Sequence, residues 1–321
     1  YTVRNTLSLH DALPIFCSEL EAMTGSGSPA FKGTSVVIPV PQEGVSPDKV
    51  HQAVREAAER FPVAIQALDS GLSSKGPFLG SSTALLLRKP AIALMTGDGV
   101  SSSEAGEAWY MLDERMEIPV SLIDNSRLGN LDLSAYNCLV LPGGAYRSWK
   151  EPEIEKLKAW VKEGGTLITM RNSVKWAIEA GIIDEELVKD EAPVLDLPYA
   201  ELGKARRGQT LSGAIFGTRL DNTHPLAFGY CPDLPVFRNH TDKLKPSKVP
   251  GANVAVYRDN PLLSGYLPEE QKGRIGGTAA IIARRSGSGA VVLFIDDPNF
   301  RGHWWGTSRI FLNAVFFGHT F

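Results

Sequence analysis

Residues 164–176, GGTLITMRNSVKW, hold the side chains of this sequence that are best placed for chemistry. The segment is typical of a buried strand that turns directly into a helix, and such an elbow projects one side chain beside the free N–H groups of the new helix. Arg171 and Asn172 stand at the tip, and neither is a nucleophile. Ser173 lies just inside the helix, where a capping or packing role is favoured over a nucleophilic one. The elbow therefore indicates the fold strongly and catalysis only weakly.

Two further loops are expected beside the elbow. Gly143 and Gly144 follow an apolar run at 137–141, and Asp98 lies in the turn that follows an apolar run at 90–96. The loops that follow parallel strands gather at one edge of their sheet. We therefore expect a cleft that is formed by Asp98, the two glycines and the elbow residues.

The charge of Arg171 needs a partner, because the N-terminus of the following helix already carries a partial positive charge. Either a nearby acid meets the guanidinium, with Asp98, Glu104 and Glu107 as candidates, or the cleft binds an anion. The internal ion pair is the favoured alternative.

His224, in the turn before Pro225, is the best candidate for a catalytic base. The competing interpretation, a turn histidine that hydrogen-bonds the backbone, is favoured. No histidine is followed by a glutamate three places on, so the His-x-x-Glu spacing of zinc peptidases is missing. Asp296 and Asp297 precede Pro298 at a strand end and are expected to cap a turn. The sequence therefore predicts no metal site.

The elements that must place these residues follow a regular rhythm from residue 89 onward. Short apolar strands alternate with helices, which is typical of a doubly wound, mostly parallel sheet in an α/β protein. The glycine-rich turn at 286–289 predicts that the last two strands form a hairpin. Strands are expected at 90–96, 119–124, 137–141, in the elbow, and at 211–220, 236–238, 254–258, 278–284 and 290–295, and helices at 104–116, 151–163, after the elbow and at 307–318.

The first 88 residues are less regular. Residues 1–16 contain the string TLSLHDALPI, which resembles translated sequencing-adapter DNA, and we exclude them from the fold as an artefact. Residues 17–88 are interpreted as a truncated α/β segment with a linker, and residues 89–321 as the main domain. Within 17–88 we expect linker composition at 17–33 and 70–82, strands at 35–40 and 63–68, and a helix that begins after Ser46.

The composition is that of an ordinary globular protein. The chain has 321 residues, with 33 Lys and Arg against 36 Asp and Glu, a formal net charge of −3. This balance argues against a nucleic-acid or anionic-membrane surface, since either normally shows a basic stripe. No apolar run reaches the roughly 20 residues that a membrane-spanning helix needs. The three cysteines have neither disulfide-framework nor zinc-site spacing.

Several motifs together resemble the class I glutamine amidotransferase-like fold. They are LVLPGG at 139–144, the GGTLI strand of the elbow, THPL at 223–226 and GAVVLFIDDPNFRGHWWGTSRIFLNAVFF at 289–317. More narrowly, these motifs and RKPAIALMTGDGVSSSEAGEAWYMLDERM at 88–116 resemble the carboxyl-terminal domain of large bacterial zinc carboxypeptidases of the carboxypeptidase A-like family. The resemblance implies a flavodoxin-like sheet with added C-terminal β-strands.

The resemblance also implies a site and a parent protein. Catalytic members of the fold have a cysteine at the elbow, a histidine base and a Gly-Gly loop that helps to form an oxyanion hole. Gly143 and Gly144 match that loop, whereas Arg171 or a neighbour stands where the cysteine would be. The parent would carry a zinc-binding peptidase domain before this one, in a secreted or periplasmic protein. For this chain we therefore expect no cofactor, and the missing peptidase domain as the partner.

The favoured hypothesis is a non-catalytic accessory domain of such a parent, with a structural or ligand-positioning role. Two alternatives stay open. One is a hydrolase or amidase that uses His224 with Ser173 or another nucleophile near Gly143 and Gly144. The other is a carbohydrate-associated module.

Overall fold

The computed structural model describes residues 15–17, 20–22, 30–31, 35–40, 42, 44–62, 65–68, 70–75, 85–189 and 196–321. The chain divides into a smaller and a larger unit after Lys89. Within the described ranges, no helix is both long enough and apolar enough to cross a membrane.

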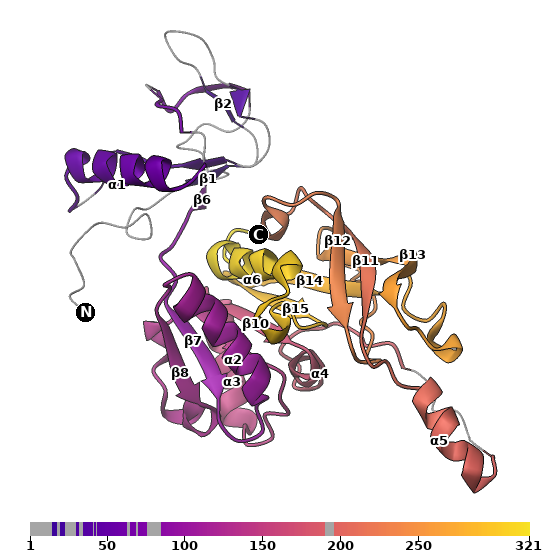
Figure 1. The fold of residues 1–321 in the computed structure, drawn as a ribbon. Helices are drawn as coiled ribbons and strands as arrows, with labels where there is room; N and C mark the ends of the chain where they lie inside the picture. Colours follow the sequence, from indigo (N-terminus) through magenta and orange to yellow (C-terminus); the bar gives the residue numbers. More distant parts are fainter. Residues whose placement is uncertain are drawn as a thin grey trace. The chain divides into compact units, whose positions relative to one another are not determined.

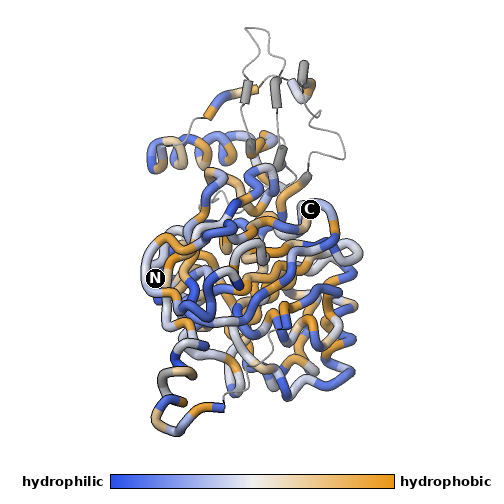
Figure 2. The backbone as a smooth tube through the Cα atoms, turned by 90° about the vertical axis from the view of Figure 1, so that its right-hand side faces the viewer, coloured by the Kyte–Doolittle hydropathy of each residue, from blue (hydrophilic) through white to orange (hydrophobic). Residues whose placement is uncertain are grey.

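The smaller unit contains α1 (Pro47–Arg60), which begins after Ser46 as predicted. Pro47 suits the first turn because the N–H that proline lacks would be unpaired there. One side of α1 buries Val50, Ala53 and Ala57, so hydrophobic and hydrophilic positions alternate along the helix (Figure 2). The strands pair in the orders β4-β1-β6 and β3-β2-β5. They are β1 (Ile15–Cys17), β2 (Leu20–Ala22), β3 (Ala30–Phe31), β4 (Ser35–Val37), β5 (Ser73–Lys75) and β6 (Leu85–Leu86).

The smaller unit differs from the sequence expectations in three places. Ile15 and Phe16, which we excluded with residues 1–14, pair with β4 and β6, while residues 1–14 lie outside the described ranges. The expected linker at 70–82 contains β5, and residues 65–68 of the expected strand at 63–68 form no strand. Strands of two or three residues are too short for a period-2 pattern, and their partners are distant in the sequence.

The larger unit is built on a nine-stranded sheet of order β12-β11-β13-β14-β15-β10-β9-β7-β8 (Figure 1). Five of these strands are parallel to their neighbours among themselves. Numbered along the chain, their spatial order is 2-1-3-4-5, which is the flavodoxin-like doubly wound arrangement. The predicted fold class is therefore confirmed. The five strands are β7 (Ile92–Thr96), β8 (Val120–Asp124), β9 (Cys138–Leu141), β10 (Thr166–Met170) and β15 (Gly289–Phe294).

Helices cover both faces of the parallel strands. Alternate residues of β7 point to opposite faces, since Ile92 and Leu94 belong to one buried cluster and Ala93 and Met95 to another. The first cluster includes residues of α2 and α6, and the second includes residues of α3 and α4. The helices of the larger unit are α2 (Ser102–Trp109), which continues as a π-helical turn at Tyr110–Arg115, α3 (Glu151–Lys162), α4 (Asn172–Glu179), α5 (Tyr199–Gly208) and α6 (Trp305–Phe317). The sequence did not predict α5.

The remaining four strands form an antiparallel extension. They lie between α4 and β15 in the sequence, so they are an insertion and not an addition at the C-terminal end. Each is antiparallel to its neighbours, and β12 therefore runs in the same direction as β10 and ends at the same edge of the sheet. The strands are β11 (Ala214–Leu220), β12 (Asp233–Arg238), β13 (Asn253–Gly265) and β14 (Ala279–Ser286), the last forming the predicted hairpin with β15.

The extension curves back over the edge of the sheet. Five strand spacings separate β12 from β10, roughly 24 Å in a flat sheet, yet Asn239 after β12 hydrogen-bonds Arg171 after β10. The register between β11 and β13 shifts twice, at Ile215/Phe216 and at Phe216/Thr218. Such bulges bend a strand and increase its twist. The bulges therefore help to bring β12 to the elbow.

Candidate functional site

The elbow has the backbone geometry of a strained strand-to-helix turn. Arg171 has φ 58° and ψ −131°, a conformation that costs a residue with a Cβ about 1–3 kcal/mol. Its N–H donates to the carbonyl of Phe294 at 2.8 Å, and its carbonyl accepts from Val174 at 3.1 Å. Because both backbone groups are bonded, the turn holds the Arg171 side chain outward beside the N-terminus of α4.

A cavity of about 480 Å³ lies at this elbow. Its wall includes the loops after β7 and β9, where the strand order of the parallel sheet reverses, and ligands of doubly wound proteins bind outside such a switch point. The side chains and backbone that line it belong to Gly99, Val100, Ser101, Glu104, Gly143, Gly144, Arg171, Asn172, His240 and Asp242.

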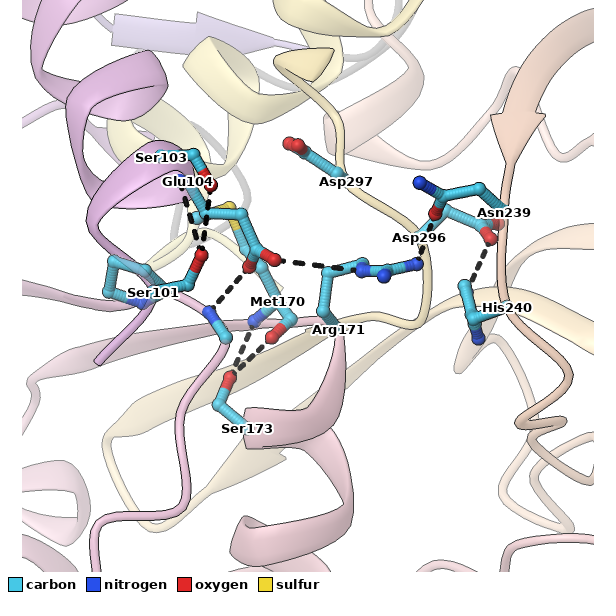
Figure 3. A network of polar contacts seen from close by, with 12 residues as sticks. Ser101, Ser103, Glu104, Met170, Arg171, Ser173, Asn239, His240, Asp296 and Asp297 are labelled. Carbon is cyan, nitrogen blue, oxygen red and sulfur yellow. Dashed lines mark hydrogen bonds and ion pairs between the residues drawn. The ribbon is translucent and has the colours of Figure 1, made fainter. Parts of the chain in front are cut away.

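Glu104, in the first turn of α2, occupies one side of the cavity. Its carboxylate accepts a hydrogen bond from the Gly143 N–H at 2.7 Å, and its other oxygen lies 3.7 Å from the Nε of Arg171. Burial and the neighbouring Asp297 raise the pKa of Glu104, whereas Arg171 and the Gly143 N–H lower it. The predicted internal ion pair of Arg171 is thus formed with Glu104 (Figure 3).

The other side of Arg171 meets residues that follow β12. Its Nη1 donates to the Oδ1 of Asn239 at 2.7 Å, and in Figure 3 the guanidinium lies between Glu104 and Asn239. His240 lines the cavity, with its Nε2 2.9 Å from Asp296. Burial and the nearby Arg238 lower the pKa of His240 to about 4. The imidazole is therefore neutral at pH 7, and its Nε2 carries the proton because a carboxylate only accepts.

Asp296 is the centre of a buried polar cluster behind His240. It accepts from Arg238 at 3.0 Å, from His240 and from the hydroxyl of Tyr257. Burial acts to raise the pKa of Asp296, but Arg238 and His240 outweigh it and hold it below its usual value. Arg238 is fully buried, so this cluster satisfies a charge that has no access to water.

Asp297 belongs to a second buried acidic group, on the α2 side of the cavity. Its carboxylate accepts from the Asn299 N–H at 2.9 Å, which confirms the predicted turn cap for this residue. Burial and the adjacent carboxyl of Glu107 raise the pKa of Asp297 to about 8. Asp297 is therefore mostly protonated at neutral pH, and Glu104 and Arg171 face it from the cavity side.

The other predicted site residues are not in the cavity. Ser173 is fully buried, where its hydroxyl accepts from the Met170 N–H and lies 2.9 Å from the carbonyl of Leu141. His224 accepts the Leu226 N–H at 3.1 Å, which is the backbone role that we favoured, and burial lowers its pKa to about 4. Asp98 is exposed and does not line the cavity, so the expectation that it joins Arg171 is wrong. The turn after β7 directs Asp98 to solvent, and α2 supplies the acid instead.

Sequence reasoning missed Asn239, His240 and Asp242, and assigned Asp296 only to a turn cap. Polar residues directly after the strand at 236–238 were a usable signal. The signal was ambiguous, because a strand of unknown direction can end at either edge of a sheet. No group of three or more His, Cys, Asp or Glu side chains within the described ranges is placed to hold a metal ion.

Glycine at position 171 should be tolerated better than alanine. We expect Arg171→Gly to unfold at about 1 kcal/mol higher free energy than Arg171→Ala, because relief of strain exceeds the entropy that glycine adds to the unfolded chain. Urea denaturation followed by tryptophan fluorescence measures the difference. At Asn172, which is helical, the order should reverse, with Ala more stable than Gly. Equal stability of the two Arg171 variants would contradict the strained geometry.

Comparisons with known proteins locate the fold only. No protein-family model and no curated protein matches the chain. Among solved structures the chain is similar to a GMP synthase subunit from Thermoplasma acidophilum, with 12% identity and a TM-score of 0.44 over 70% of this chain and 92% of that one. It is also similar to ThuA-like proteins from Bacteroides uniformis (9%, 0.45, 70% and 88%) and Parabacteroides merdae (15%, 0.45, 72% and 91%). Likeness at this level carries no argument about function, and it adds no support for a carboxypeptidase parent. The fold assignment rests on the observed strand order.

Proposed function

We propose that the larger unit is a non-hydrolytic accessory domain that holds or positions a ligand at the elbow cavity. The observation that carries this proposal is the occupation of the two positions that amide hydrolysis would need. Arg171 stands at the elbow tip, where a nucleophile would be. The Gly143 N–H, which would stabilise an oxyanion, already donates to the carboxylate of Glu104.

The hydrolase alternative is disfavoured by the same geometry. The Ser173 hydroxyl is bonded to backbone groups of Met170 and Leu141, and the imidazole of His224 is bonded to the backbone of Leu226. Neither side chain lines the cavity. A carbohydrate-binding role is disfavoured because no aromatic side chain lines the cavity, whereas sugar rings commonly stack on aromatic faces.

The finer part of the proposal is the parent protein. The sequence motifs support a carboxyl-terminal domain of a zinc carboxypeptidase-like protein, with the zinc peptidase domain encoded upstream. Sequencing the source DNA upstream of the codon for Cys17 tests this. An upstream His-x-x-Glu motif with a later histidine supports the proposal. An upstream reading frame that encodes a different enzyme class overturns it without affecting the non-hydrolytic assignment.

The purified chain should hydrolyse neither amides nor esters, and Arg171→Ala should not change this. We expect product formation at the rate of the uncatalysed reaction with glutamine, with amino-acid anilides and with nitrophenyl esters. Ammonia release and chromogenic assays measure it. Turnover by the wild type that is lost in Ser173→Ala or Arg171→Ala would show a working site and contradict the proposal.

A further inference from the structure

The cavity keeps hydrogen-bond donors that no group of the protein uses. Within the described residues, the backbone N–H groups of Gly144 and Asn172 and the Nη2 of Arg171 donate no hydrogen bond. The N–H of Asn172 belongs to the first turn of α4, whose N-terminus carries a partial positive charge. These donors form an anionic subsite at the elbow, and the bond from Gly143 to Glu104 shows that a carboxylate is accepted next to it.

The cavity also keeps acceptors on its opposite wall. The carboxylate of Asp242 is exposed at the rim and makes no ion pair or hydrogen bond with any described residue. The Nδ1 of His240 is an acceptor, because the proton of the neutral ring is on the Nε2 that faces Asp296. A cationic group would be stabilised here and repelled by Arg171.

We infer that the cavity binds a free α-amino acid, with its carboxylate at Arg171, Gly144 and Asn172 and its ammonium group at Asp242 and His240. The inference rests on the proposed function and names its ligand class. A cavity of about 480 Å³ is within the usual range for small-molecule sites. The charges of opposite sign on its two walls select a dipolar ligand over a simple anion or cation. A peptide C-terminus, which has no ammonium group, should bind more weakly.

Calorimetric titration of the full chain with each of the twenty L-amino acids tests the inference. We expect at least one amino acid to bind with a dissociation constant between about 1 μM and 1 mM. Its amide, which lacks the carboxylate, and its N-acetyl derivative, which lacks the ammonium group, should each bind about tenfold or more weaker. Binding of none of the amino acids at up to about 10 mM, or equal binding of the three forms, overturns the inference.

Asp242→Asn supplies a test that does not disturb the buried clusters, since Asp242 is exposed. It should weaken the amino acid about fivefold or more and leave the N-acetyl derivative unchanged. Asp259→Asn, at an exposed acid away from the cavity lining, is the matched control and should change neither. Equal weakening of both ligands by Asp242→Asn would contradict the assigned ammonium contact. Chromatography of the ligand after titration separates this inference from the proposed function, because only cleavage of the amide overturns the latter.

Discussion

Asp296→Ala should lower the free energy of unfolding of the larger unit by about 3–5 kcal/mol. The change leaves the fully buried Arg238 without the carboxylate that neutralises it, and an unpaired buried charge costs that much. It also removes an acceptor from His240 and from Tyr257. All six tryptophans lie between residues 109 and 305, so tryptophan fluorescence in urea reports on the larger unit alone.

Asp233→Ala is the matched control for this prediction. It breaks another Arg–Asp pair, with Arg258, whose side chains are 47% and 67% exposed. Exposed pairs contribute about 0–1 kcal/mol, so little change is expected. The double variant Arg238→Met with Asp296→Leu should recover most of the lost stability, because it removes both charges together. If Asp296→Ala does not fold, Asp296→Asn should show a smaller loss in the same direction. A loss no larger than that of Asp233→Ala would show that the cluster does not stabilise the fold.

Asp297→Asn should become increasingly stabilising, relative to the wild type, as the pH rises from about 4 to about 8. The folded protein keeps the Asp297 proton up to a pKa of about 8, whereas the unfolded chain loses it near 3.8. The folded state therefore binds more protons in this window, and the stability contributed by this group is complete below pH 3.8 and lost as the pH approaches 8. The expected slope of the difference is up to about 1.4 kcal/mol per pH unit, and it should vanish above about pH 8.

The comparison between variant and wild type removes the opposing titrations. Burial lowers the pKa of His224 and of His240 to about 4, so each makes the protein more stable as the pH rises from about 4 to 6.5. Both histidines are present in both proteins, and their contributions cancel in the difference. Asp259→Asn, at an exposed acid, should give a difference that is flat across the same range. A flat difference for Asp297→Asn as well would mean that Asp297 is ionised in the folded protein.

These two clusters flank the cavity and explain why its shape is held in place. Asp296 fixes the orientation of the His240 ring from one side. Asp297 and Glu107 join α2, which carries Glu104, to the loop after β15. A binding site needs its contacting groups positioned by surrounding residues whose own hydrogen bonds are satisfied. Changes in either cluster are therefore expected to weaken ligand binding as well as stability.

The sequence by itself determined the parallel half of the larger unit and the elbow. Apolar strands that alternate with helices leave few arrangements other than a doubly wound sheet, and in that sheet the loops that carry Gly143 and Arg171 must share an edge. The need of Arg171 for an acidic partner followed from the positive end of the next helix, and Glu104 was among the three acids considered. These inferences succeeded because they depend on local periodicity and on general rules of chain connection.

Only the tertiary structure decided which other residues reach the cavity. Asn239, His240 and Asp242 arrive there because four antiparallel strands set the direction of β12 and because bulges in β11 bend the extension back. Asp98 is excluded because a turn that is one residue long or short redirects a side chain, and short-range patterns do not fix that direction. Burial then set the charges, since the same aspartate type is held ionised at 296 by Arg238 and protonated at 297 by Glu107. Register, curvature and desolvation are properties of contacts between distant segments, and neither composition nor spacing records them.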